Sequence, residues 1–248
     1  MSHHSSAFKS ANGFTLVELA ISLVVIGILI GGVMKGQELI SNSRVASLLR
    51  QMDEYDSAAL VFFSSYEAIP GDIKNPSDRL NRCDTGLCST GGNGNGKIRN
   101  EDTSPQRIES FNFFPHLTKA GMIQSGPDGG NAVTTSNSLS AAVVAQFFPN
   151  TPYGMEVRIG SYTASSHVHD IHNAYMIPGY YQTTSRKTLS GTVMQQIDNK
   201  IDDGNPRTGH VFVQINGTCP IIEQSAGVWT YVPDATSTDC ILYVRAEF

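Results

Sequence analysis

The hydrophobic pattern of the chain is dominated by one apolar block. From Phe14 to Met34 the sequence reads FTLVELAISLVVIGILIGGVM, in which Glu18 is the only charged residue. A run of this length, about 21 residues, is sufficient to cross a bilayer as an α-helix. We therefore predict one membrane span over residues 14–34 and no other span.

The helical pattern continues beyond this block. Apolar residues recur at alternating spacings of three and four, a stripe made by Val45, Leu48, Met52, Tyr55, Ala59, Phe62 and Tyr66. No proline occurs between Phe14 and Pro70, so one helix of about 53 residues is predicted, with an amphipathic half over residues 35–69. The stripe suits a coiled-coil stalk or docking on a globular head. Its aromatic residues favour docking, because coiled-coil seams prefer aliphatic side chains.

Four glycines are the weak points of this predicted helix. They form two G-x-x-x-G patterns, Gly27 to Gly31 and Gly32 to Gly36. Glycine lowers helix stability, whereas G-x-x-x-G allows two helix backbones to approach closely. Local melting and close packing both remain open.

Residues 70–248 are predicted to form a globular α+β head with an antiparallel β-sheet. Gly, Asn, Ser and Asp dominate residues 70–106, which indicates an irregular surface loop. Helices are predicted over 108–121 and 189–201, and residues 125–140 are linker-like. Strands are predicted over 153–160, 174–178, 210–215, 228–232 and 241–245.

The net charge of the chain argues against one class of binding partner, the polyanions. The 248 residues contain 17 Lys and Arg against 22 Asp and Glu, a formal net charge of -5. A protein that binds polyanions needs a positive surface, so no specific nucleic-acid binding is expected.

The segment before the apolar block does not read as an ordinary secretory signal. It is polar, MSHHSSAFKSANG, and no A-x-A-like cleavage site follows the apolar run. Gly13 followed by Phe14-Thr-Leu-Val-Glu18 and an unbroken apolar stretch resembles the N-terminus of type IV pilins and type II secretion pseudopilins. In that family, prepilin peptidase removes a leader, here residues 1–13, by cutting after Gly13, and methylates the new N-terminal residue, here Phe14. A plain signal anchor, with Glu18 near the headgroups, is the alternative.

The resemblance also implies a fold, a role and partners. The fold is pilin-like, with the long N-terminal helix packed on the head, although many pilins carry a proline where this chain has Lys35. Glu18 becomes an assembly residue that pairs with the α-amine of an adjacent subunit, since a carboxylate in low dielectric needs a partner. The implied partners are other copies in a homopolymer or mixed filament, prepilin peptidase, the pilus or secretion assembly machinery, and the inner membrane before export to an extracellular filament. A pseudopilin of a type II secretion or DNA-uptake system is the alternative.

Four cysteines in an exported head are expected to be bridged. Three pairings are possible, and we prefer Cys83 with Cys88 and Cys219 with Cys240. The second pair resembles the C-terminal disulfide loop of type IV pilins, which type II pseudopilins usually lack. Four reduced thiols in a cytosolic head are the alternative.

Three further motifs invite a chemical interpretation. Residues 91–97 match G-x-x-x-x-G-K, but Ile98 stands where a phosphate-binding loop needs Ser or Thr. Possible calcium ligands occur nearby without the order of a calcium loop: Asp84, Asn93, Asn95, Glu101 and Asp102. A histidine cluster suits zinc but lacks the H-x-H-x-D-H order of metallo-hydrolases: His167, His169, Asp170 and His172, with His116 and His210 isolated.

An acidic turn follows the second predicted helix, made by Asp198, Asp202, Asp203 and Asn205. Carboxylates at a helix C-terminus meet an unfavourable dipole unless a cation or Arg207 compensates. Calcium binding and a hydrogen-bonded turn are both open. No catalytic residue order appears, so we expect a structural protein that is not an enzyme and carries no cofactor. A membrane-anchored enzyme or metal-binding module is the alternative from a different class.

Overall fold

The computed structural model describes residues 14–98, 107–130, 141–162, 171–177, 188–214, 219, 221–225, 227–233 and 240–248. The chain divides into two compact units, Met1–Ser43 and Arg44–Phe248. The predicted α+β class is confirmed, with a long apolar N-terminal helix followed by a globular part that contains an antiparallel sheet.

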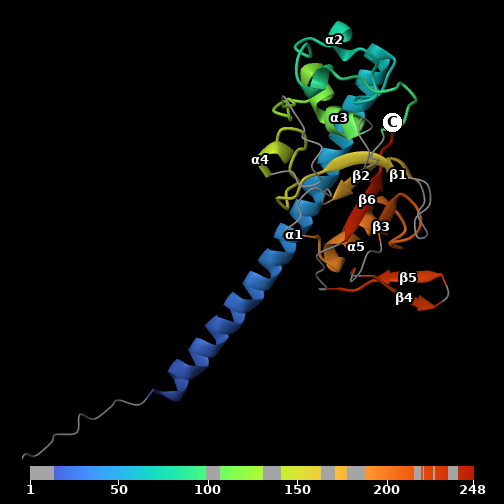
Figure 1. Cartoon of the computed structure of the whole chain (residues 1–248). Helices are drawn as coiled ribbons and strands as arrows, with labels where there is room; N and C mark the ends of the chain where they lie inside the picture. The colour runs from blue at the N-terminus through green and yellow to red at the C-terminus, as the bar shows by residue number, and fades with distance from the viewer. Residues whose placement is uncertain are drawn as a thin grey trace, which may run out of the picture. The chain divides into compact units, whose positions relative to one another are not determined.

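Helix α1 spans Leu16–Tyr66, 51 residues, and is coloured blue in Figure 1. The predicted long helix is therefore confirmed, and it is continuous through all four glycines. Within the described residues, α1 is the one helix long and apolar enough to cross a membrane. Such a helix needs only local backbone hydrogen bonds, so an unbroken run without proline suffices to predict it.

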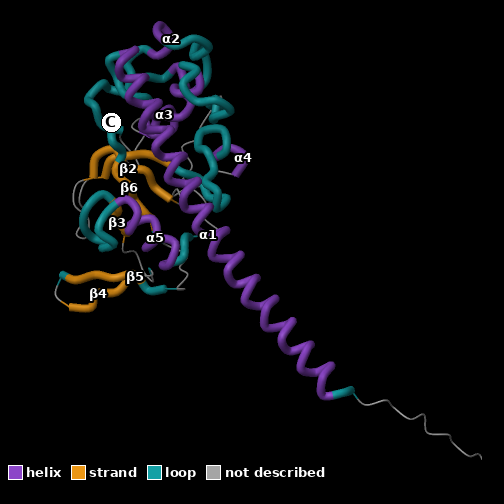
Figure 2. The backbone as a smooth tube through the Cα atoms, turned by 180° about the vertical axis from the view of Figure 1, so that it is seen from behind, coloured by secondary structure: helices purple, strands orange, loops and turns teal. Residues whose placement is uncertain are grey.

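In the second unit, the predicted apolar stripe of α1 enters the core. Its buried members are Val45, Leu48, Met52, Tyr55, Ala59 and Phe62. Helix α3, Arg107–Lys119, lies beside this part of α1 (Figure 2). The ring centroids of Tyr55 and Phe114 are 4.9 Å apart. Pro115 lies inside α3 without ending it. The sequence prediction that the stripe serves docking on a head is consistent with this packing.

A four-stranded antiparallel sheet completes the main core. Its strands are β1 Arg158–Tyr162, β2 Ile171–Ile177, β6 Ile241–Arg245 and β3 Val211–Gln214, in the order β1-β2-β6-β3. The last strand of the chain thus lies between β2 and β3 (Figure 1). Tyr175 and Leu242 belong to the core that includes α1, whereas Met176 and Tyr243 belong to a smaller apolar cluster. Both faces of β2 and β6 are covered, which explains their nearly continuous apolar sequences.

The strand predicted over 228–232 belongs to a different sheet. It is β5, Val228–Tyr231, and it pairs only with β4, Ile221–Ser225, within the described chain. Strand β4 was not predicted, because only Ile221 of its five residues is buried and little apolar alternation marks it.

The prediction of a surface loop over residues 70–106 is partly wrong. The described part contains the short helices α2, Pro76–Arg79, and η1, Leu87–Ser89. It also contributes buried core residues, namely Ile73, Leu80, Cys83, Cys88 and Ile98. These residues are scattered without helical or strand periodicity, so their burial leaves no pattern in the sequence.

Two further helices lie in the second unit. Helix α4 spans Ala141–Val144 and α5 spans Gly191–Ile201. The predicted start of α5 at Leu189 is two residues early, because Ser190 is the N-cap and its side chain accepts a hydrogen bond from the Val193 N–H.

Candidate functional site

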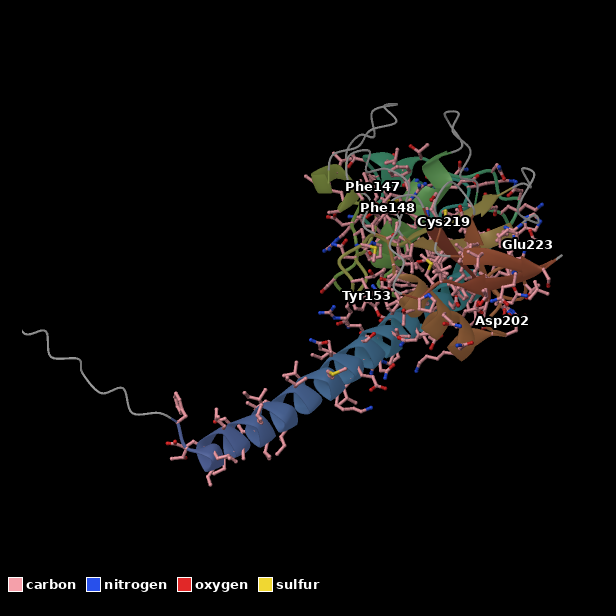
Figure 3. All side chains as sticks on the ribbon, turned by 90° about the horizontal axis from the view of Figure 1, so that it is seen from below. Phe147, Phe148, Tyr153, Asp202, Cys219 and Glu223 are labelled. Carbon is pink, nitrogen blue, oxygen red and sulfur yellow. A yellow bond between two sulfur atoms is a disulfide. The ribbon has the colours of Figure 1, made fainter. Side chains whose placement is uncertain are left out.

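The apolar half of α1 is exposed along its whole described length. Every residue from Phe14 to Met34 is solvent-accessible, and Leu16 and Ile28 are 84% and 70% exposed. The side chains project around the helix in Figure 3. A helix that is apolar on all sides is stable only inside a membrane or among other apolar surfaces. The segment therefore requires surroundings that its own chain does not supply.

Glu18 has a local partner at the start of this helix. The backbone N–H and the hydroxyl of Thr15 both donate to Glu18 Oε2, each at 2.9 Å, and the Glu18 N–H donates to Thr15 Oγ1 at 3.2 Å. This reciprocal arrangement is a capping box, and its T-x-x-E signature is visible in the sequence, although no capping box was predicted. Gly13 lies outside the described residues, so cleavage and pairing with another subunit's amine stay predictions.

Gly27, Gly31, Gly32 and Gly36 have no packing role within the described part of the chain. A Cβ added at Gly27, Gly31, Gly32 or Gly36 would meet no other atom within 4 Å. Each glycine costs the helix up to about 1 kcal/mol relative to alanine. Since nothing in the described chain needs these small residues, contacts with another molecule are the physical reason that we favour.

Two disulfides lie in the second unit. Cys83 bonds to Cys88, and Cys219 bonds to Cys240, 21 positions later. These are the two expected pairs. The longer bridge closes a loop that contains β4 and β5, because it joins Cys219 to Cys240, the residue just before β6. It therefore holds the exposed β4–β5 hairpin to the main sheet.

The glycine-rich loop is occupied by a protein carboxylate. The Gly94 and Gly96 N–H groups donate to the two oxygens of buried Asp72, at 2.6 and 2.7 Å. Asn173 on β2 anchors the same loop, since it accepts from the Ile98 N–H at 2.8 Å and donates to the Gly96 carbonyl. Backbone donors that would cradle a phosphate are thus already used inside the fold.

Two of the possible calcium ligands of this region, Asn93 and Asn95, serve local turns. Asn93 Oδ1 accepts from the Asn95 N–H, and Asn95 Oδ1 accepts from the Lys97 N–H. Glu101 and Asp102 lie outside the described residues. The described amide oxygens thus stabilise backbone turns.

The predicted histidine cluster lies largely beyond the described part of the chain, which omits His167, His169 and Asp170. His172 is exposed on β2. His116, by contrast, is fully buried beside the shorter disulfide.

His116 is held in one neutral form by its surroundings. The Gly71 N–H donates to its Nδ1 at 2.9 Å, and its Nε2 lies 3.1 Å from the Cys88 carbonyl oxygen. Nε2 therefore carries the proton, because the carbonyl can only accept. Burial lowers the pKa of His116 to about 4, despite the opposing hydrogen bond to Cys88. Both ring nitrogens are engaged in holding the fold.

Three carboxylates gather at the end of α5, with oxygens of Asp198, Asp202 and Asp203 within 4.8 Å of one another. Asp198 is buried and accepts from the Tyr231 hydroxyl at 2.7 Å and from the Gly204 N–H at 3.2 Å. Burial raises the pKa of Asp198 to about 6, against the effect of both hydrogen bonds. Asp198 thus links β5 to α5.

The other two carboxylates organise the following turn. Asp203 accepts from the Thr208 hydroxyl at 2.6 Å and from the Asn205 N–H at 2.8 Å, and the bond from Thr208 is the main reason that its pKa is lowered. Asp202 accepts from the His210 N–H. A hydrogen-bonded turn is therefore present. These hydrogen bonds do not depend on calcium, and calcium binding here stays a prediction.

Arg207, which the sequence offered as one possible compensating charge for these carboxylates, is engaged elsewhere. Its guanidinium lies over the Trp229 ring, 5.5 Å from the centroid. Among the described residues it forms no ion pair with the three carboxylates. Arg207 instead fixes β5 by a cation–π contact.

Comparison with known proteins points to the N-terminal end of the chain. Residues 8–34 match the family model of the prokaryotic N-terminal methylation motif. No curated protein and no solved structure matches the chain significantly. The matched residues include Gly13, Phe14, Glu18 and the apolar half of α1.

Proposed function

The prokaryotic N-terminal methylation motif is the signature of type IV pilins and pseudopilins, and from it we propose that the chain is a structural subunit of a type IV pilus filament. Prepilin peptidase cuts between Gly13 and Phe14 and methylates the new amine of Phe14. The subunit resides in the inner membrane as a single-pass protein and is then assembled into an extracellular filament.

The observation that carries this proposal is the exposed apolar half of α1. Leu16, Leu23 and Ile30 are each more than half exposed, and no described residue of the chain covers them. Exposure of one such side chain to water costs about 1.5–3 kcal/mol. The segment must therefore pass from one apolar environment, the bilayer, to another, the interior of a filament.

This transfer gains little from the hydrophobic effect, because lipid chains are as apolar as neighbouring helices. Packing of small residues and polar contacts between helices must favour the filament. Close packing would come from the small residues Gly27, Gly31, Gly32 and Gly36. The polar contact would come from Glu18.

Glu18 sets the register of assembly in this proposal. Cleavage after Gly13 creates a positive amine on Phe14, and an amine paired with a carboxylate in low dielectric is strongly favoured over either charge alone. Thr15 holds Glu18 Oε2 at the first turn of α1. The capping box thereby presents the carboxylate at a defined height for the amine of the next subunit.

One observation favours a pilus over a pseudopilus. The Cys219–Cys240 bridge resembles the C-terminal disulfide loop of type IV pilins, and it closes around an exposed hairpin. A pseudopilin of a type II secretion or DNA-uptake system is the second candidate, since it shares the N-terminal motif.

The register role is tested with Glu18→Gln, which removes the charge and keeps the shape. We expect normal amounts of processed subunit in the inner membrane and a loss of sheared surface filaments. Glu38→Gln is the matched control, because Glu38 lies on the same helix beyond the apolar block and, within the described chain, pairs with exposed Lys35. A normal filament yield from Glu18→Gln would remove the register role.

Mass spectrometry tests the processing step independently. The mature protein is expected to begin with N-methylated Phe14. An intact Met1 or a cut at another position would refute the family assignment. Electron microscopy with mass spectrometry of sheared filaments then decides between the two candidates, because only a pilus subunit should form part of long surface fibres.

A further inference from the structure

The part of α1 that lies in the second unit carries two exposed charges without partners. Arg50 and Glu54 are four positions apart on this helix, and both are exposed. Within the described chain neither side chain forms a hydrogen bond or an ion pair, whereas Lys35 and Glu38 of the same helix are paired. Assembly through Glu18 alone leaves both charges unused.

An ion pair within the helix does not account for these charges. Residues at i and i+4 lie on adjoining turns, so Arg50 and Glu54 are close enough in sequence to pair. The arginine, however, precedes the glutamate, which is the weaker order for such a pair. In the structure the two side chains form no ion pair. Both charges are therefore available to another molecule.

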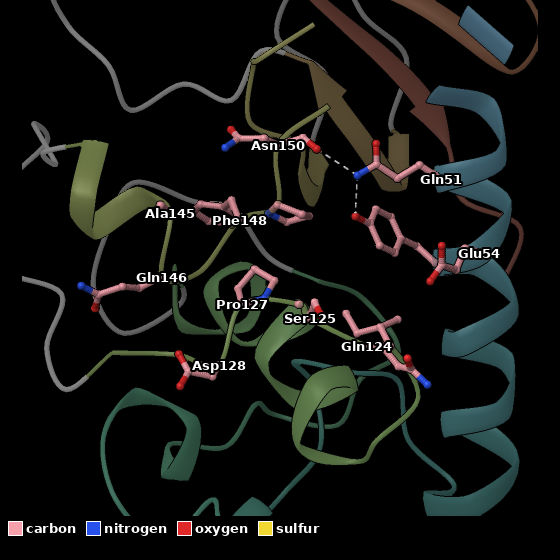
Figure 4. A pocket seen from close by; sticks show the side chains of 14 residues that line it. Gln51, Glu54, Gln124, Ser125, Pro127, Asp128, Ala145, Gln146, Phe148 and Asn150 are labelled. Carbon is pink, nitrogen blue, oxygen red and sulfur yellow. Dashed lines mark hydrogen bonds between the residues drawn. The ribbon is translucent and has the colours of Figure 1, made fainter. Parts of the chain in front are cut away.

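The surroundings of Glu54 favour a cation. Figure 4 shows Glu54 on α1 beside an open pocket of about 550 Å³, whose opposite side is formed by two loops, residues 123–128 and 145–150. The exposed side chains of Asp128 and Gln146 also line this pocket, and none of its lining residues is Lys, Arg or His. A cation that approaches from solvent thus meets two carboxylates and no like charge.

The spacing of Arg50 and Glu54 equals the spacing of the proposed assembly pair. In that pair, Glu18 of one copy meets the amine of Phe14 of the next copy. Two parallel helices in this arrangement are shifted by four residues, or about 6 Å at 1.5 Å per residue. The same shift brings Arg50 of the next copy level with Glu54 of the first. One displacement between copies therefore gives both carboxylates a cationic partner.

The interval between the two pairs also fits the helical repeat. Glu18 and Glu54 are 36 positions apart in α1, and Phe14 and Arg50 are separated by the same interval. At 3.6 residues per turn, 36 residues complete ten whole turns. Both pairs therefore recur at the same phase of the repeat, as contact with one neighbouring helix requires.

A second arginine separates this shift from a larger one. Arg44 is also exposed, and a shift of ten residues would place it level with Glu54. That shift would place Glu18 level with residue 8, which the proposed cleavage removes. The four-residue shift satisfies Glu18 and Glu54 together. It leaves Arg44 level with Leu48, which offers no charge.

We propose that α1 binds a second copy of this chain through an ion pair between Arg50 and Glu54, with the helices shifted by four residues. The inference rests on the proposed filament role. Each copy presents Arg50 to the neighbour on one side and Glu54 to the neighbour on the other, so the contact is heterologous and repeats without closing. Charges that flank parallel helices set their register, as they do in coiled coils.

Two charge variants test this contact in cells that express the full chain. Arg50→Glu leaves only carboxylates at the two positions, and Glu54→Arg leaves only cations. Each variant alone sets like charges against one another between copies, so the yield of sheared filaments should fall by about 10-fold or more. Co-expression of the two variants should restore the yield to within about twofold of the unaltered protein, because alternating copies again pair opposite charges.

A matched control and a cross-link complete the test. Arg44→Glu makes an equal change of charge at an exposed position of α1 and should leave the filament yield unchanged. For the cross-link, one copy carries Arg50→Cys and another carries Glu54→Cys, while the four native cysteines are already paired. Filaments from cells that express both should contain disulfide-linked dimers. Cells that express either one alone should not produce them.

Several results would overturn the proposal. Normal filament yield from both charge variants, or an equal loss from Arg44→Glu, would show that assembly does not select this pair. Failure of co-expression to restore the yield would place the effect within one helix. Filaments without the cross-linked dimers would exclude the four-residue shift. Failure of the proposed function is distinguishable, because the unaltered chain itself would then be missing from sheared filaments.

Discussion

The contribution of buried His116 to the stability of the second unit should fall in mild acid. His116 lies on α3 between the Gly71 N–H and the Cys88 carbonyl, with the Phe62 ring stacked 6.4 Å away. None of these neighbours can stabilise an imidazolium at Nδ1, where the Gly71 donor points. Protonation of the folded protein therefore requires a charge in an apolar site.

The size of the effect follows from linkage. Burial lowers the pKa of His116 from 6.5 to about 4. Above pH 6.5, His116 is neutral in both the folded and the unfolded protein, so its protonation costs no stability. As the pH falls from the higher value toward the lower one, the unfolded chain takes up a proton and the folded chain does not. Stability is lost at up to about 1.4 kcal/mol per pH unit, or about 2 kcal/mol between pH 7 and pH 5.

Two carboxylates act in the opposite direction and must be separated from this effect. Burial raises the pKa of both Asp56 and Asp198 to about 6, so their contribution to stability grows as the pH falls through this value. The comparison is therefore made with His116→Gln, which keeps polar atoms near the site and cannot be protonated. His172→Gln, at an exposed position on β2, is the control.

The assay is urea unfolding of the full chain in phosphocholine micelles at pH 7 and pH 5. Trp229 is the only tryptophan, so its fluorescence reports the second unit. The difference in unfolding free energy between the unaltered protein and His116→Gln should shrink by about 2 kcal/mol from pH 7 to pH 5. Equal pH slopes for these two proteins would show that His116 is not sealed from water in the folded state, and would refute the reasoning.

Two other perturbations probe the head and the apolar helix. Cys219→Ser with Cys240→Ser removes a bridge across 21 positions and should lower the unfolding free energy by about 3 kcal/mol by the chain-entropy relation; unchanged urea midpoints would contradict a stabilising role. Gly31→Ala should leave the amount of membrane-inserted subunit unchanged, since a Cβ there meets nothing within 4 Å in its own chain, yet should reduce filament yield if neighbouring backbones pack closely at this glycine. Wild-type filament yield from Gly31→Ala would favour local melting over close packing, and Ser47→Ala, an alanine change in the amphipathic half of α1, serves as the control.

Local sequence accounts well for the helices. The spacing of Val45, Leu48 and Met52 predicted the buried face of α1, and the structure confirms it. The backbone hydrogen bonds of a helix join residues four positions apart. A short stretch of sequence is therefore enough to predict both the helix and its apolar face. The capping box of Thr15 and Glu18 was equally local and could have been predicted.

The pairing of the strands in the sheet could not be predicted from local sequence. Strands were predicted over 174–178 and 241–245, but their adjacency as β2 and β6 joins residues far apart in the chain. Strand β4 was missed because a mostly exposed strand carries almost no alternation. Pairing partners depend on non-local contacts that hydrophobic patterning does not encode.

The candidate sites divide in the same way. Residues 91–97 match the spacing of a phosphate-binding loop, which Ile98 argues against, and only the fold shows that Gly94 and Gly96 instead surround Asp72, more than 20 positions earlier. The pocket likewise joins Glu54 on α1 to Asp128 and Gln146 on two loops. None of these residues is unusual in its own sequence context.

By itself, the sequence determined the membrane-length apolar helix, its single carboxylate and the methylation motif, because each depends on neighbouring residues along one helix. Tertiary structure alone decided which polar groups have hydrogen-bond partners within the fold and which do not. It placed Asp72 inside a glycine-rich loop, buried His116 beside a disulfide, and left Arg50 and Glu54 exposed and unpaired within the described chain. Burial and hydrogen bonding are properties of three-dimensional neighbours, and these come from segments that the linear order keeps apart.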